Sequence, residues 1–257
     1  MKLTLLRFQA YILLAATIVF FGFGCSNSKE AKEEKAANEA DTSSSQLLRV
    51  NGEIFSIPSP IQTAFLIKES GANFNKDMLN PSKNQPNYTT NFKKALNLGV
   101  YGADLGYVSL YDQTQEAIKY MQSVKKLADD VGVTGAFDNS LVTRFQNNIG
   151  VQDSLLVLVS SAFRASDAYL KNNQRNDISS LILVGGWVES INFAINADKQ
   201  KASDAIKRRI VEQKSALQSI IKLLGTIGSK PEYTDLIEKL KDLAASFEKL
   251  APYKFAQ

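Results

Sequence analysis

Cys25 is the only cysteine in this 257-residue chain, so an intramolecular disulfide is excluded. The fold must therefore be stabilised by the packing of apolar side chains. Residues 47–257 are long enough to form one sizeable hydrophobic core. This region is expected to be the folded domain.

The residues before Cys25 have the layout of a secretory signal. Lys2 and Arg7 form a short positive region, and Tyr11–Phe23 is almost wholly apolar. Gly24 is the small residue directly before the cysteine. This order is typical of a signal peptide that is removed after export.

A signal that ends on a cysteine resembles that of bacterial lipoproteins, in which the thiol is joined to a lipid. The resemblance implies a signal peptide at 1–24, a lipidated Cys25 and a solvated tether at 25–46. Ser26 after the cysteine favours sorting to the outer membrane. The alternative is an uncleaved N-terminal membrane anchor.

Charge and composition exclude several classes of function. Removal of residues 1–24 takes away Lys2 and Arg7, and the formal charge falls from +4 to +2. No dense basic cluster with interleaved aromatic residues occurs, so nucleic acid is not an expected partner. The chain contains no histidine, which excludes Ser-His-Asp catalysis and histidine-ligated metal sites.

The rest of the chain carries helical signals. Leu47–Phe55 is expected to be a short strand or extended lead-in, with Asn51 and Gly52 as a turn. Apolar residues then recur every three to four positions, which indicates helices. The expected helices are Pro60–Gly71, Thr89–Tyr111, Gln113–Val131, Asn139–Asn148, Asp153–Tyr169, Asn176–Ala197, Ser203–Leu224 and Ser229–Leu250.

This pattern predicts an all-α, bundle-like single domain of about seven or eight antiparallel helices. A TPR- or HEAT-like helical array remains an alternative. The helix around Ile178–Ile195 is apolar on nearly every side and is expected to be central. Glu189 ends its apolar run, which argues against a membrane span.

One candidate site lies on the segment Leu98–Tyr107, where glycines at spacings of three and four allow close packing of another helix. Asp104 would lie beside the resulting groove. Tyr101, Tyr107 and Tyr111 would add hydroxyl groups to it. The alternative is a buried aspartate that a tyrosine or a lysine satisfies.

Trp187 and Glu189 form a second candidate, just after Gly185 and Gly186. If Glu189 meets Asp104, the two carboxylates would suit acid–base chemistry or a divalent cation. The alternative is a core tryptophan with a surface or capped glutamate.

Three segments together resemble an uncharacterised family of Bacteroidetes lipoproteins: Ile57–Pro60, Leu98–Tyr107 and Gly185–Glu189. The resemblance covers most of residues 54–200. It implies an all-helical, lipid-anchored protein of the cell envelope. It assigns no activity and no catalytic residue.

We therefore expect a non-enzymatic binding or scaffold module, anchored by lipid at the periplasmic face or the outer surface of the outer membrane. Its partner would be an envelope protein or a small ligand, and no cofactor, metal or catalytic residue is assigned. One alternative is a carboxylate- or metal-dependent enzyme that uses Asp104 and Glu189. The other is a structural spacer.

Overall fold

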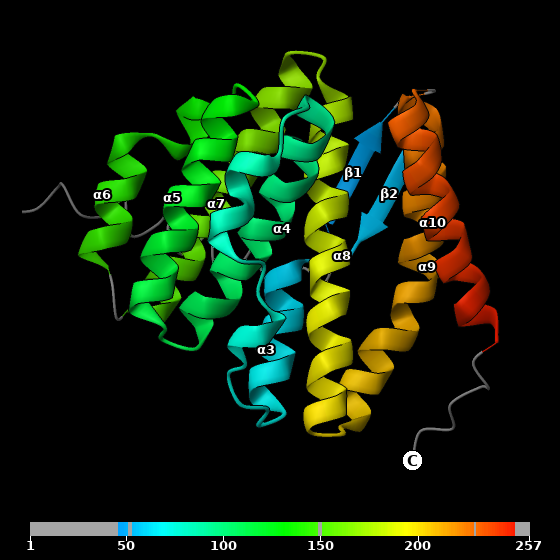
Figure 1. Ribbon diagram of the computed structural model, residues 1–257, viewed down its shortest axis with the longest axis horizontal. Coiled ribbons are helices and arrows are strands. Elements are labelled where there is room, and N and C mark those ends of the chain that lie inside the picture. The colour runs from blue at the N-terminus through cyan, green and yellow to red at the C-terminus, as the bar shows by residue number, and fades with distance from the viewer. Residues whose placement is uncertain (1–45, 51–52, 149–150, 229, 250–257) are drawn as a thin grey trace, which may run out of the picture. The chain divides into compact units, whose positions relative to one another are not determined.

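The computed structural model describes residues 46–50, 53–148, 151–228 and 230–249. They belong to one compact unit, Ser43–Gln257 (Figure 1). The signal peptide, Cys25 and the tether up to residue 45 lie outside the described residues. The described elements are β1 (Gln46–Val50), β2 (Glu53–Ile57), α3 (Pro60–Glu69), η1 (Lys76–Met78), η2 (Ser82–Asn87), α4 (Asn91–Leu110), α5 (Thr114–Asp130), η3 (Thr134–Phe137), α6 (Asn139–Asn147), α7 (Gln152–Asn172), α8 (Asn176–Gln200), α9 (Asp204–Ile227) and α10 (Pro231–Glu248).

Helices dominate these residues, and the predicted all-α class is confirmed. The segment expected to be a strand or lead-in forms two five-residue strands, β1 and β2, which pair with each other. They are antiparallel, with Gln46 opposite Ile57 and Val50 opposite Glu53. The predicted turn at 51–52 lies outside the described residues. An Asn-Gly pair between two strands is the sequence typical of a two-residue hairpin.

Two pairs of consecutive helices, α4 with α5 and α9 with α10, pack in an antiparallel manner. Lys94 near the start of α4 forms a 3.2 Å ion pair with Asp130 at the end of α5. Lys214 in the first half of α9 forms one of 2.8 Å with Glu248 at the end of α10. This is the antiparallel bundle arrangement that the short connections predict.

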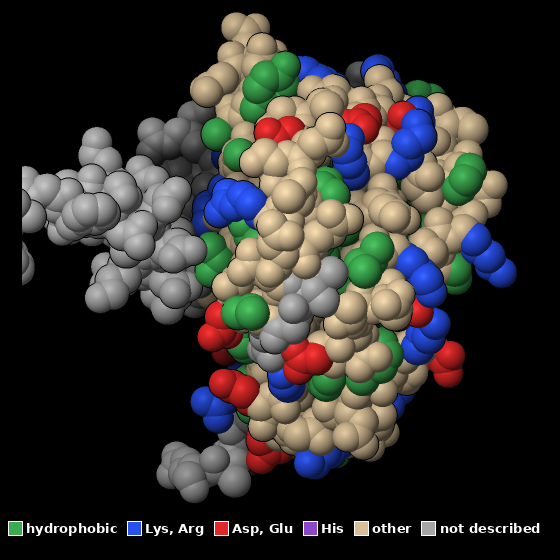
Figure 2. All heavy atoms as spheres, turned by 90° about the vertical axis from the view of Figure 1, so that its left-hand side faces the viewer, with side chains coloured by type: hydrophobic (Ala, Val, Ile, Leu, Met, Phe, Trp, Pro, Cys, Tyr) green, Lys and Arg blue, Asp and Glu red, His purple; other side chains and the backbone are tan. Residues whose placement is uncertain are grey.

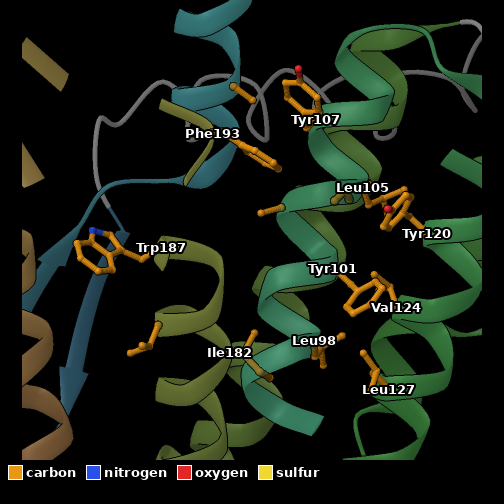
Figure 3. Close-up of a cluster of buried hydrophobic side chains, with 14 of the residues drawn as sticks. Leu98, Tyr101, Leu105, Tyr107, Tyr120, Val124, Leu127, Ile182, Trp187 and Phe193 are labelled. Carbon is orange, nitrogen blue, oxygen red and sulfur yellow. The ribbon is translucent and has the colours of Figure 1, made fainter. Parts of the chain in front are cut away.

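The central pair, α4 and α8, differs because these helices run parallel. Figure 3 shows Leu98 and Tyr107 on α4 rising in the same direction as Ile182 and Phe193 on α8. The rings of Tyr107 and Phe193 stack with their centroids 4.6 Å apart. The α4–α8 contact joins helices distant in sequence, whereas a repeat array packs each unit on its sequence neighbours.

Two glycines allow the backbones of α4 and α8 to touch. A Cβ atom on Gly99 would lie 1.8 Å from the main-chain oxygen of Ile182. A Cβ atom on Gly185 would lie 1.8 Å from the main-chain oxygen of Leu96. No side chain fits at either position. The close helix packing predicted at Gly99 is therefore found, and it requires glycine because the two backbones are in contact.

The parallel contact places α8 in the middle of the fold. Among the described residues, α8 is the one helix long and apolar enough to cross a membrane. Most of its apolar window is buried inside the protein, as in the core helix of a globular domain. The prediction of a central helix at Ile178–Ile195 is therefore confirmed.

Candidate functional site

Asp104 and Glu189 face each other across the α4–α8 contact. They lie between the glycine contact at Gly99 and the stacked rings of Tyr107 and Phe193. Because the two helices run parallel, residues about 86 apart in sequence lie level with each other, and Asp104 falls opposite Glu189. The exposed fractions are 0% for Asp104 and 5% for Glu189.

Burial dominates the electrostatics of this carboxyl pair. It raises the pKa of Asp104 well above the usual value, and the neighbouring charge of Glu189 raises it further. Burial also raises the pKa of Glu189. Neither carboxyl forms an ion pair with any lysine or arginine that the structure describes. Both groups therefore favour their protonated forms.

Hydrogen bonds satisfy only some of the buried carboxyl oxygens of Asp104 and Glu189. Glu189 Oε1 accepts a 3.1 Å bond from Asn192 Nδ2. Neither carboxyl oxygen of Asp104 has a partner with hydrogen-bond geometry among the described residues. The amide groups of Asn80 approach both carboxyls closely enough to lower their pKa values, but burial outweighs this effect.

Asn80 belongs to residues 72–88, which we call the covering segment. Tyrosine hydroxyls from two helices fix its main chain. Tyr111 donates to the Ala72 oxygen at 2.8 Å, Tyr107 accepts from the Asn75 nitrogen at 3.1 Å, Tyr101 donates to the Pro81 oxygen at 2.8 Å, and Tyr120 donates to the Asn80 oxygen at 2.6 Å. The covering segment is thus held over the carboxyl pair by four tyrosine bonds to its backbone and by a 3.3 Å bond from Asn192 Nδ2 on α8 to the Met78 oxygen.

These tyrosines stay protonated at all ordinary pH values. Burial raises the pKa of Tyr111 to about 12. Burial also raises the pKa values of Tyr101 and Tyr120, and the charge of Asp104 adds to both shifts. Tyr101 and Tyr120 therefore lie beside the carboxyl pair, while their hydroxyls donate hydrogen bonds to the covering segment.

The six residues predicted to line a groove have different positions. Tyr101, Asp104, Tyr107 and Glu189 are buried beside the covering segment, and Tyr111 is half-buried there. Trp187 points away from them, and its Nε1 donates to Gln213 Oε1 on α9 at 3.0 Å (Figure 3). The groove between α4 and α8 is filled, so the expected ligand groove is corrected, and Asp104 is buried as in the alternative stated for it. Gly185–Ser190 lie within α8, inside the helix expected at Asn176–Ala197.

The sequence left open whether Asp104 and Glu189 meet, and the structure brings them together in a sealed environment. The described residues contain no group of three or more histidine, cysteine, aspartate or glutamate side chains that could hold a metal ion. Because a general acid or base must reach the proton it transfers, a carboxyl pair without solvent access is suited to a structural role.

A polar pocket lies on the surface between η2 and α5. Its volume is about 290 Å³, and its lining residues are Ser82, Lys83, Gln85, Lys119, Gln122 and Ser123. Lys119 contacts Glu116 at 3.1 Å, and Lys83 has no ion-pair partner among the described residues. Sequence analysis missed this pocket, because serine, lysine and glutamine at these spacings are ordinary on a helix surface.

Charges of both signs mix on one face of the protein. On the face at the left of Figure 1, lysine and arginine side chains alternate with aspartate and glutamate (Figure 2). This face therefore lacks the continuous basic stripe that nucleic-acid backbones require.

Comparisons of the chain with protein-family models, with curated proteins and with solved structures find no match. The resemblance to Bacteroidetes lipoproteins stays a prediction.

Proposed function

We propose that this chain is a lipid-anchored protein of the cell envelope whose helical domain acts as a non-enzymatic binding or scaffold module. The N-terminal layout ending at Cys25 supports the lipid anchor. Ser26 after the cysteine supports an outer-membrane location. The membrane is the first partner in this proposal, through the lipid.

The sealed position of Asp104 and Glu189 carries the non-enzymatic part of the proposal. These are the two carboxyls on which an enzyme mechanism would depend, and both are almost completely buried. The covering segment lies over them and is bonded to α4 and α5 through tyrosine hydroxyls. A substrate would have to displace this segment before it could touch either carboxyl.

The polar pocket between η2 and α5 is the binding surface that suits this module best. Its lining consists of hydrogen-bonding side chains, and two of these, Lys83 and Lys119, are positive. Its volume of about 290 Å³ lies at the low end for small-molecule sites. A small anionic, hydrogen-bonding group is the ligand chemistry that this lining fits.

The anchor is tested by expressing the full chain and the Cys25→Ala variant in a related bacterial host. Intact-mass measurement and membrane fractionation would be made on both. The proposal expects a mass that lacks residues 1–24 and carries an added lipid, with loss of the lipid and of membrane association in Cys25→Ala. A soluble, unmodified wild-type chain would overturn the proposed location.

A further inference from the structure

Among the residues that the structure describes, no lysine or arginine forms an ion pair with either carboxyl of the pair. Tyr101 approaches from α4, Tyr120 from α5, Asn192 from α8 and Asn80 from the covering segment. Glu116 on α5 is a charged neighbour of Tyr120, and its charge raises the pKa of that tyrosine.

Glu116 adds little charge to the pair, because two lysines compensate it at the surface. Its Oε1 lies 2.8 Å from Lys76 Nζ and 3.1 Å from Lys119 Nζ. Both lysines contact Glu116 at the surface, and neither forms an ion pair with Asp104 or Glu189. Two ionised carboxylates in such a site are strongly unfavourable without a cation.

We propose that the buried pair Asp104 and Glu189 keeps one proton at neutral pH, and that the proton-bearing pair is a latch that keeps the covering segment seated. A singly ionised pair carries one negative charge, which the nearby amide groups of Asn80 can stabilise. A second negative charge has no further donor, because the hydroxyls of Tyr101 and Tyr120 already donate to main-chain oxygens. When the last proton is lost, the doubly ionised pair is therefore more stable in contact with water than in the buried site.

The covering segment is the part of the fold best suited to open when this happens. It contains two short 3-10 turns, η1 with three residues and η2 with six. Short turns at a surface open locally at lower free energy than long core helices such as α4 and α8. The segment also contributes Asn80, the residue that contacts both carboxyls. Opening it admits water to the pair and exposes the side of α4 that carries Asp104.

The test is amide hydrogen exchange of the full chain between pH 6 and pH 9, with rates divided by the intrinsic rate at each pH. In the wild type, the protection of amides in 72–88 is expected to fall at least about tenfold, while α10 keeps its protection. Glu189→Gln removes one titrating group and retains the oxygen that accepts from Asn192. In that variant the protection of 72–88 should change by less than about twofold.

Asp235→Asn is the matched control, because this exposed carboxyl on α10 forms only a surface contact with Lys239. It should behave like the wild type. Protection of 72–88 that does not vary with pH in the wild type would overturn the proposal. An equal loss of protection in Glu189→Gln would also overturn it. A third contradicting result would be protection of 72–88 that rises when Ca²⁺ or Mg²⁺ is added and falls when a chelator is added. The last result would show that a cation, not a proton, neutralises the pair.

Discussion

The Tyr120 hydroxyl on α5 donates a 2.6 Å hydrogen bond to the main-chain oxygen of Asn80. Through this bond α5 holds the covering segment at the point where Asn80 meets the carboxyl pair. The ring of Tyr120 also lies 5.9 Å from that of Tyr101, which bonds the next residue of the segment, Pro81. The two tyrosines hold consecutive carbonyls.

Tyr120→Phe should therefore lower the free energy of unfolding by about 1–3 kcal/mol, because it leaves a partly buried carbonyl without its donor. The measurement is chemical denaturation at neutral pH. Tyr169→Phe is the control, because Tyr169 is 50% exposed and its hydroxyl can bond to water. Equal effects of the two substitutions would show that the Tyr120 bond does not stabilise the fold.

Gly185→Ala should destabilise the protein by about 1–3 kcal/mol or more, because the added methyl overlaps the Leu96 carbonyl and must separate α4 from α8. Gly225→Ala is the matched control within α9, where no described atom lies within 4 Å of the added Cβ. Helix propensity alone predicts a gain of up to about 1 kcal/mol there. Thermal and chemical unfolding measure both variants. A stabilised Gly185→Ala variant would contradict the close backbone contact.

The contribution of Asp104 and Glu189 to the stability of the wild type should fall as pH rises from about 4 toward neutral, whereas Glu116 and Asp130, whose lysine contacts lower their pKa values, contribute with the opposite sign. Burial raises the pKa values of Asp104 and Glu189 in the folded state, so the folded protein binds more protons than the unfolded chain over this range. Each unit of pH then costs up to about 1.4 kcal/mol per group that stays protonated. The stability that these two groups contribute is fully present at low pH. It decreases as the pH rises, and the decrease ends once the pH has passed the pKa values of the folded state.

Asp104→Asn removes one of these groups, so its unfolding free energy should vary less steeply with pH than that of the wild type. Denaturation series at several pH values measure the slope, with Asp235→Asn as the surface control. Identical slopes for Asp104→Asn and the wild type would mean that Asp104 is ionised in the folded protein.

Binding of inorganic phosphate is the simplest probe of the polar pocket. In a chemical-shift titration at constant ionic strength, the double variant Lys83→Ala/Lys119→Ala should bind about tenfold more weakly than the wild type. Lys125→Ala should not change binding, because Lys125 lies on α5 outside the pocket and contacts Asp129. Equal weakening by Lys125→Ala would indicate general charge attraction rather than a site.

The helices were predictable because their apolar periodicity is local. The expected Thr89–Tyr111 helix corresponds to α4 at Asn91–Leu110, and the tight packing expected at its glycines is found at Gly99. The hairpin at 46–57 was predictable only in part: Asn51 and Gly52 indicate a turn, but each flanking strand has five residues, which is short for a clear alternating pattern.

The site was harder to predict, because it depends on contacts between distant segments. Asp104 and Glu189 meet only through the parallel packing of α4 on α8, which no local pattern encodes. Trp187 is next to the glycine pair in sequence, but its helical position turns it toward Gln213 on α9. The covering segment has no periodicity of its own, so its bonds to four tyrosines could not be read from sequence.

The sealed, protonated state of the Asp104–Glu189 pair is the central claim, and infrared difference spectroscopy tests it most directly. Spectra of the wild type and Glu189→Gln would be compared at pH 7 in H₂O and D₂O. The structure predicts a carbonyl band of a protonated carboxyl group that shifts in D₂O and is lost or displaced in the variant. A wild-type spectrum with only ionised carboxylate bands at this pH would contradict the claim.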